Sequence, residues 1–267
     1  MNKESNPLFH KDYPLSSKYD PQFVFSNQMG PNVLWLAEWL AKDMDLRPGM
    51  KVLDLGCGKA ISSIFLAKEF DVDVWATDLW IRPAENMIRI DEENLGSRIF
   101  PVRAEAHNLP YAEGFFDRII SIDSYHYFGT DQMYMGYIAR YLKPGGRMGA
   151  AVPGLHHELK DGVPEHLRKP QRAGNIFWLW ECITFHSAEW WQSLWTNYDF
   201  MEILKCEGMK NGGNLWLQWE KAIEASSVEK LFPADTEALE ADKNLNLTFV
   251  KIIAERNNRK IDFYTGD

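Results

Sequence analysis

The residues from Val52 to Ala60 place one acid and two closely spaced glycines at the end of an apolar run. Asp54 precedes Gly56 and Gly58, and a helix-like stretch follows. Glycine has no Cβ, so the backbone can bend sharply at a strand end and a ligand can lie directly against it. The first turn of the following helix offers unpaired N–H groups. This pattern predicts a cradle for a nucleotide-like ligand.

Two details of the turn distinguish between nucleotide cofactors. The dinucleotide fingerprint G-x-G-x-x-G requires a small third residue for close helix packing, and Ile61 at that position argues against NAD. Asp54 suits instead a cofactor with a positively charged amino group, as S-adenosylmethionine has. The segment resembles motif I of the class I S-adenosylmethionine-dependent methyltransferases, (D/E)-x-G-x-G-x-G, with Ala60 at the third glycine.

Further segments follow in the order found in that family. They are a second strand at 72–76 with an acid after it, a third strand at 99–102, an adenine segment at 104–110, an F-D-x-(I/V) strand start at 116–121 and an L-K-P-G-G turn at 142–146. Each alone is explained as turn or cap chemistry, but together and in this order they predict one cofactor site.

The resemblance assigns roles to individual residues. It implies that an acid about 20 residues beyond the second glycine binds the ribose hydroxyls, and that the segment after the third strand lies at the adenine. The cofactor-binding residues that it implies, besides the motif I acid and glycines, are Asp78, Leu79, Glu105, Ala106 and Ser121.

The segment 121–128 leaves the carboxyl end of the predicted sheet, where ligands bind in open α/β folds. His126 lies there and titrates in a range suited to a general base. It resembles a histidine of small-molecule amine methyltransferases that pairs with an N-terminal tyrosine. We therefore predict His126 and Tyr19 as catalytic residues, with Tyr13 as the alternative partner. A packing role for His126 between its tyrosine neighbours remains open.

Strand-like and helix-like segments alternate up to about residue 152, which predicts βαβ units. We expect an α/β, Rossmann-like fold: a seven-stranded, mostly parallel sheet with helices on both faces and a closing antiparallel hairpin from 200–204 and 247–254. The predicted parts are an N-terminal arm or lid at 1–30, the S-adenosylmethionine-binding core at 31–153, a tryptophan-rich cap insertion at 154–198 and the C-terminal part of the fold at 199–267.

The predicted cap contains histidines and tryptophans. His156, His157 and His166 have no close set of acids or cysteines, so we expect solvated loop residues and no metal site. The tryptophans fit a buried helix face or a substrate pocket equally well. They are Trp178, Trp180, Trp190, Trp191 and Trp195. Farther on, the run 237–242 predicts a solvated helical face.

Composition limits the classes of partner. The 267 residues carry a formal charge of −9, which argues against nucleic acid. Three cysteines without paired spacing favour a reducing compartment, and no apolar run reaches the length of a membrane span. We expect a cytoplasmic protein with a small-molecule partner, and a homo-oligomer is possible.

The sequence thus predicts an S-adenosylmethionine-dependent methyltransferase that acts on a small molecule, at nitrogen or oxygen rather than carbon. One alternative is a cyclopropane-synthase-like C-methyltransferase. The other is a protein that binds S-adenosylmethionine or S-adenosylhomocysteine without catalysis, because an inactive site would leave these motifs intact.

Overall fold

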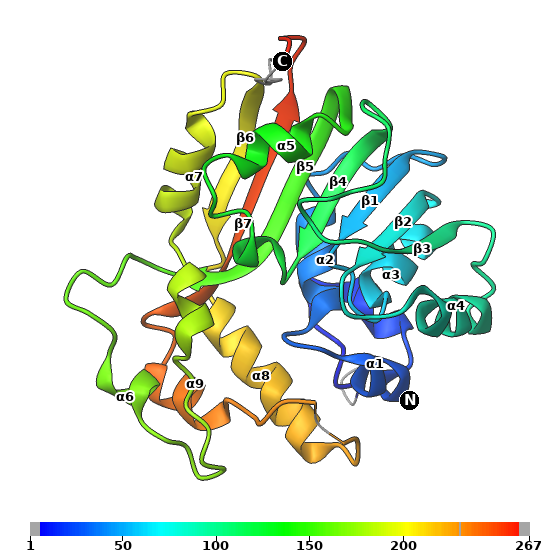
Figure 1. Ribbon diagram of the computed structural model, residues 1–267. Helices are drawn as coiled ribbons and strands as arrows, with labels where there is room; N and C mark the ends of the chain where they lie inside the picture. The colour runs from blue at the N-terminus through cyan, green and yellow to red at the C-terminus, as the bar shows by residue number, and fades with distance from the viewer. Residues whose placement is uncertain (1–5, 230, 262–267) are drawn as a thin grey trace.

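A seven-stranded sheet in the order β3-β2-β1-β4-β5-β7-β6 crosses the molecule (Figure 1). The computed structural model describes residues 6–229 and 231–261, so the first five residues of the predicted arm and residues 230 and 262–267 of the predicted C-terminal part lie outside the described residues. β1 to β5 are parallel, and β7 is antiparallel to both of its neighbours. The strands are β1 Lys51–Leu55, β2 Asp73–Asp78, β3 Ile99–Arg103, β4 Phe116–Ile122, β5 Leu142–Leu155, β6 Met201–Gly208 and β7 Leu247–Arg256. The predicted fold class is confirmed.

Helices cover both faces of the sheet because its strands alternate their apolar side chains between two cores. Val52, Ile120 and Ala151 pack with α2 and α3, whereas their neighbours Leu53 and Ile119 pack with α5 and α7. The helices are α1 Pro21–Asn27, α2 Val33–Ala41, α3 Ile61–Phe70, α4 Pro83–Glu92, α5 Tyr134–Ala139, α6 Glu165–Arg168, α7 Ala188–Thr196, α8 Gly212–Ala225 and α9 Thr236–Asp242. The short 3-10 helices are η2 Pro14–Lys18, η3 Tyr125–Tyr127 and η4 Trp180–Thr184.

Four helices gather at the end of the sheet to which the parallel strands point. Figure 1 shows α1 on one side of this lower end, and α6, α8 and α9 on the other. The carboxyl ends of β1, β2 and β4 therefore lie next to elements from both the N-terminal and the C-terminal part of the chain. This arrangement positions the candidate site.

Three expectations about individual elements were wrong. The turn at 142–146 does not precede β5 but lies inside it, as a bulge between the pair Leu142–Phe116 and the pair Arg147–Arg118. The run 237–242 is not fully solvated, because Asp242 is 1% exposed and accepts hydrogen bonds from the backbone N–H groups of residues 246 and 247. The histidines of the predicted cap are not all solvated, since His166 binds Asp242 at 3.0 Å.

The tryptophans of residues 154–198 divide between the two interpretations. Trp191 and Trp195 on α7 are fully buried and pack against the sheet face that α5 also covers. Trp180 on η4 is 85% exposed. Trp191 and Trp195 therefore form core, whereas Trp190 on the same helix is partly buried and stacks on His186.

Part of the arm is fixed to α2. Glu38 is buried and accepts hydrogen bonds from the N–H groups of Leu15 and Ser16, at 2.9 and 3.3 Å. Trp35 Nε1 donates to the Leu8 carbonyl at 2.9 Å. Residues 8–16 are consequently held in place.

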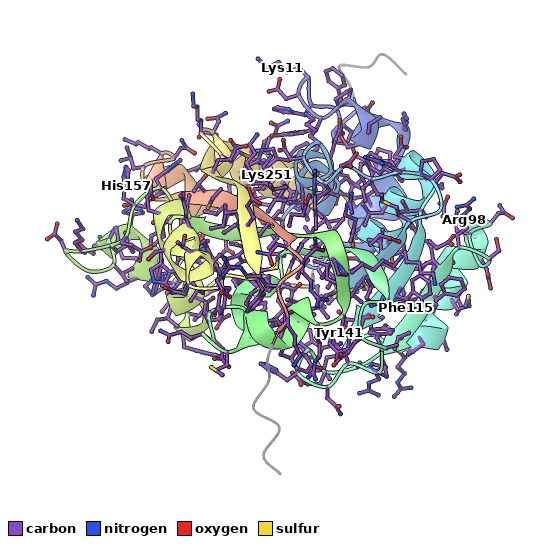
Figure 2. All side chains as sticks on the ribbon, turned by 90° about the horizontal axis from the view of Figure 1, so that it is seen from above. Lys11, Arg98, Phe115, Tyr141, His157 and Lys251 are labelled. Atoms are coloured by element: carbon purple, nitrogen blue, oxygen red, sulfur yellow. The ribbon has the colours of Figure 1, made fainter. Side chains whose placement is uncertain are left out.

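A buried lysine joins the antiparallel edge of the sheet to α2. Lys251 on β7 is 1% exposed and lies toward the middle of the view in Figure 2, whereas Lys11 and Arg98 lie at its edges. Its Nζ binds Asp43 at 2.5 Å and Glu207 at 3.2 Å, which supplies the pairing that a buried charge requires.

Among the described residues, no helix is long and apolar enough to cross a bilayer.

Candidate functional site

Glycine suits two positions of the turn between β1 and α3. Gly56 has φ +75° and Gly58 has φ +53°, conformations in which a Cβ is strained. A Cβ on Gly56 would lie 2.2 Å from Ser124 Oγ, and one on Gly58 would lie 2.9 Å from Met29 Sδ. Bare backbone therefore faces both β4 and the arm, as the cradle predicted from the sequence requires.

Asp54 lies beneath this turn and is wholly buried. Its Oδ2 accepts hydrogen bonds from the hydroxyls of Ser62 and Ser63, both at 2.6 Å, while its Oδ1 is buried without a partner. Burial raises the pKa of this carboxyl to about 6, although the two serines lower it. A buried acceptor without a donor fits a ligand that brings a positively charged amino group, because the ligand would supply the missing hydrogen bond.

Asp78 joins the glycine turn to the loop after β2. Its Oδ2 accepts from Gly58 N at 2.9 Å, and its Oδ1 accepts from the N–H groups of Trp80 and Ile81 at 2.8 and 2.9 Å. Leu79 is 46% exposed beside it. The two N–H groups use both lone pairs of Oδ1, but Oδ2 keeps one, so the position suits both the ribose role and the cap role.

The predicted adenine segment follows β3. Glu105 is exposed and binds His107 through both the backbone N–H, at 2.7 Å, and Nδ1, at 2.9 Å. Burial opposes ionisation, but these hydrogen bonds hold the pKa of Glu105 below its usual value. The carbonyl of Ala106 accepts from Tyr134 OH at 3.1 Å. The segment is thereby fixed against α5, and the backbone of residue 104 is bonded to Asp78 O.

Ser121 is buried at the end of β4 and has a structural bond. Its hydroxyl donates to Leu55 O at 2.8 Å and lies 2.8 Å from Ser124 Oγ, which also reaches Leu55 O. These hydroxyls hold the ends of β1 and β4 together. Ser121 therefore has a structural role next to the glycine turn.

Asp123 is the site residue that sequence reasoning missed. It follows β4 directly, has φ +55°, and its Oδ2 would lie 2.2 Å from a Cβ on Gly30. Within residues 6–229 and 231–261, no group donates a hydrogen bond to its carboxyl, and burial alone raises its pKa to about 8. The only sequence signal was an acid directly after a strand, two residues before the aromatic run that begins at Tyr125.

The structure does not bring the two predicted catalytic residues together. Tyr19 packs on Phe65 and lies 3.5 Å from Glu69, near the end of α3 that is farther from the glycine turn. His126 is 1% exposed, between Tyr127 and Phe185. Burial lowers the pKa of His126 to about 3, which makes it a weak proton acceptor at neutral pH. This environment favours the packing interpretation of His126. Tyr13, the alternative partner, stacks on His10 instead.

The last part of the arm reaches the site and is held there by three elements. Lys59 Nζ binds Ser26 O at 3.3 Å, and Arg89 Nε binds Asn27 Oδ1 at 2.7 Å. Trp219 Nε1 on α8 donates to Gly30 O at 2.9 Å. Residues 26–30 thus lie over the glycine turn and beside the carboxyl end of β4.

Comparisons with known proteins agree with this geometry. Residues 52–146 match a family model described as methyltransferase domain. Methyltransferase GfsG of Streptomyces halstedii is 34% identical over 140 residues, which are 52% of this chain and 48% of that protein. The chain spans about half or less of the length of the first curated relatives that it matches.

Solved structures share the fold over most of the chain. The [4+2]-cyclase SpnF has a TM-score of 0.64 at 18% identity and covers 86% of this chain and 85% of its own. A geranyl diphosphate C-methyltransferase from Streptomyces coelicolor A3(2), in complex with Mg²⁺, geranyl diphosphate and S-adenosyl-L-homocysteine, has a TM-score of 0.63 at 16% identity, over 96% of this chain and 94% of its own.

Proposed function

We propose that this protein transfers a methyl group from S-adenosylmethionine to nitrogen or oxygen of a small molecule, since residues 52–146 match a methyltransferase domain. The observation that carries the proposal is the Asp123 carboxyl, which lies without a partner at the carboxyl end of β4 beside the glycine turn. The family match supports the cofactor, and Asp123 supports an acceptor that carries a proton.

The residues of the turn fit the cofactor by their chemistry. Asp54 Oδ1 would accept a hydrogen bond from the cofactor amino group, Gly56 and Gly58 leave space for it, and Asp78 would receive the ribose. When bound, the cofactor supplies a methyl group that is already activated by its sulfonium. The protein then needs chiefly to align an acceptor and remove its proton.

Asp123 would remove that proton. A general base acts best when its pKa lies near the working pH, and burial brings the pKa of Asp123 to about 8. A protonated amine or a hydroxyl would supply the hydrogen-bond donor that the carboxyl lacks. An alkene carbon offers this carboxyl no hydrogen-bond donor before transfer and needs a base only afterwards, to remove a proton from the carbocation, so transfer to carbon is the less favoured reaction.

The arm would exclude water from the transfer. Residues 26–30 lie over the turn, and Trp219 holds them from α8. We propose that only this last part of residues 1–30 acts as a lid, since residues 8–16 are fixed to α2. The net charge and cysteine content further support a reducing compartment such as the cytoplasm and a partner other than nucleic acid.

Two measurements test the function. Calorimetry should show S-adenosylmethionine and S-adenosylhomocysteine binding, and no binding of NAD. Incubation of the protein with methyl-labelled S-adenosylmethionine and a metabolite extract should then yield a labelled product by mass spectrometry, with Asp123→Asn protein as the control. Tight NAD binding without a response to S-adenosylmethionine would refute the cofactor. Cofactor binding without any product from broad acceptor libraries would favour a non-catalytic binder.

A further inference from the structure

A hollow of about 650 Å³ lies beyond the carboxyl end of β5, outside the cofactor turn. Its walls come from Leu155 at the end of β5, from the loop 156–163 and from the segment 178–186 that contains η4. Phe185 joins it to the site, because its ring lines the hollow and also contacts His126 at 5.6 Å between ring centroids. The hollow therefore adjoins the segment that follows β4.

The walls of the hollow are mainly apolar. Trp180 and Ile183 are 85% and 74% exposed on η4, and Leu179 is 48% exposed. Large apolar side chains that remain exposed together around a concave surface mark a binding site more often than a plain surface does. The apolar residues that line it are Leu155, Leu159, Val163, Trp178, Leu179, Trp180, Ile183 and Phe185.

The polar groups of the hollow bind each other. Glu158 Oε2 lies 3.2 Å from His186 Nδ1, and Glu158 Oε1 accepts from Ser187 N at 2.7 Å. The His186 ring stacks flat on Trp190, with centroids 3.6 Å apart. Among the described lining residues there is no lysine or arginine, so a phosphate would meet the Glu158 carboxylate without a compensating cation.

The position of the hollow sets the length of its occupant. Asp123 N bonds to Ala151 O, and β5 continues four residues farther to Leu155. At 3.3 Å per residue this is about 13 Å. A molecule that reacts beside Asp123 and fills the hollow must be roughly that long.

Building on the proposed methyltransferase function, we propose that this hollow binds the apolar end of an elongated, uncharged acceptor, and that it discriminates against acceptors whose far end carries a phosphate. The reacting nitrogen or oxygen would lie at Asp123, and the hydrocarbon part would cover the exposed rings and side chains of η4. This assigns a substrate class to a surface that the cofactor motifs do not reach.

The test compares two probes that share the reacting hydroxyl and differ at the far end, geraniol and 8-hydroxygeraniol 8-phosphate, by quenching of tryptophan fluorescence in protein saturated with S-adenosylhomocysteine. We expect saturable quenching by geraniol, with a Kd at least tenfold below that of the phosphate. Ile183→Glu should raise the geraniol Kd at least tenfold. Ile88→Glu, at a 62% exposed position on α4, is the matched control and should leave it unchanged.

Three results of the comparison between probes and variants would overturn the inference. These are equal affinity for the two probes, no effect of Ile183→Glu, and dissociation of a dimer by Ile183→Glu in sedimentation, which would make the hollow a contact between copies of the chain. Calorimetry with S-adenosylhomocysteine separates the two proposals. Failure of the wild-type protein to bind it refutes the methyltransferase function, whereas normal binding with no response to geraniol refutes only the assignment of the hollow. Both variants should keep the wild-type affinity for S-adenosylhomocysteine, which shows that they are folded.

Discussion

Replacement of Asp123 by asparagine should stabilise the protein while it impairs turnover. The carboxyl is held away from hydrogen-bond donors, and burial raises its pKa from 3.8 to about 8. Asparagine has the same shape, needs no charge and tolerates φ +55° better than most residues. The substitution therefore removes the cost of a buried carboxyl without a new steric cost.

The sign and size of the change in stability follow from the linkage between proton binding and folding. Between pH 3.8 and about 8 the unfolded chain loses the Asp123 proton while the folded protein keeps it, so wild-type stability falls as pH rises through this interval. At about 1.4 kcal/mol per pKa unit, the full interval corresponds to roughly 6 kcal/mol. The Asp123 side chain is only partly buried, and screening by water reduces this upper bound. We therefore expect the free energies of unfolding of wild type and Asp123→Asn to differ by about 2 kcal/mol.

Urea unfolding of wild type and Asp123→Asn at pH 4, 6 and 8.5 measures this difference. It should be near zero at pH 4 and largest at pH 8.5. Asp45→Asn is the matched control, because Asp45 also has positive φ but is ion-paired on the surface, where a hydrogen bond from Arg47 lowers its pKa. That variant should lose a little stability, and the loss should disappear as pH falls. A pH-independent gain for Asp123→Asn would refute the argument.

Three further predictions concern the same site. Asp78→Ala should weaken S-adenosylhomocysteine binding by about 1–3 kcal/mol in calorimetry, and an unchanged Kd in a folded variant would remove Asp78 from the ribose. His126→Ala should lower kcat less than about tenfold and reduce stability by roughly 2–4 kcal/mol through a cavity, whereas a loss of 10²–10⁴-fold would restore His126 as the base. Trp219→Phe should increase amide hydrogen exchange at residues 28–30 and weaken cofactor binding, because it removes the hydrogen bond to Gly30 O. Trp35→Phe is the control, since it loses an equivalent indole hydrogen bond to Leu8 O and should change neither measurement. Equal effects of the two variants would exclude a lid held by α8.

The sequence predicted the parts of the molecule that depend on short-range chemistry. The glycines of the turn, the acid at the end of β2 and the alternation of strands and helices are local signals, and the structure shows each of them, although β2 extends two residues farther than expected and includes Asp78. Expectations that depended on packing were less successful. Trp191 and Trp180 lie close together in the sequence, but one is wholly buried under the sheet and the other is 85% exposed, because only α7 packs on β6 and β7.

The prediction of His126 as the general base also failed to account for packing. A histidine is a better base than an aspartate by its ordinary pKa, so the sequence favoured His126 over its neighbour Asp123. Burial reverses that order, since the charged form is disfavoured in both residues: the pKa of His126 falls to about 3 and that of Asp123 rises to about 8. The contact that isolates Asp123 comes from Gly30, which is about 90 residues away in the chain and is placed by Trp219 from α8. The proton affinity of the site is thus set by long-range packing, and a motif that lists residue types without their surroundings cannot report it.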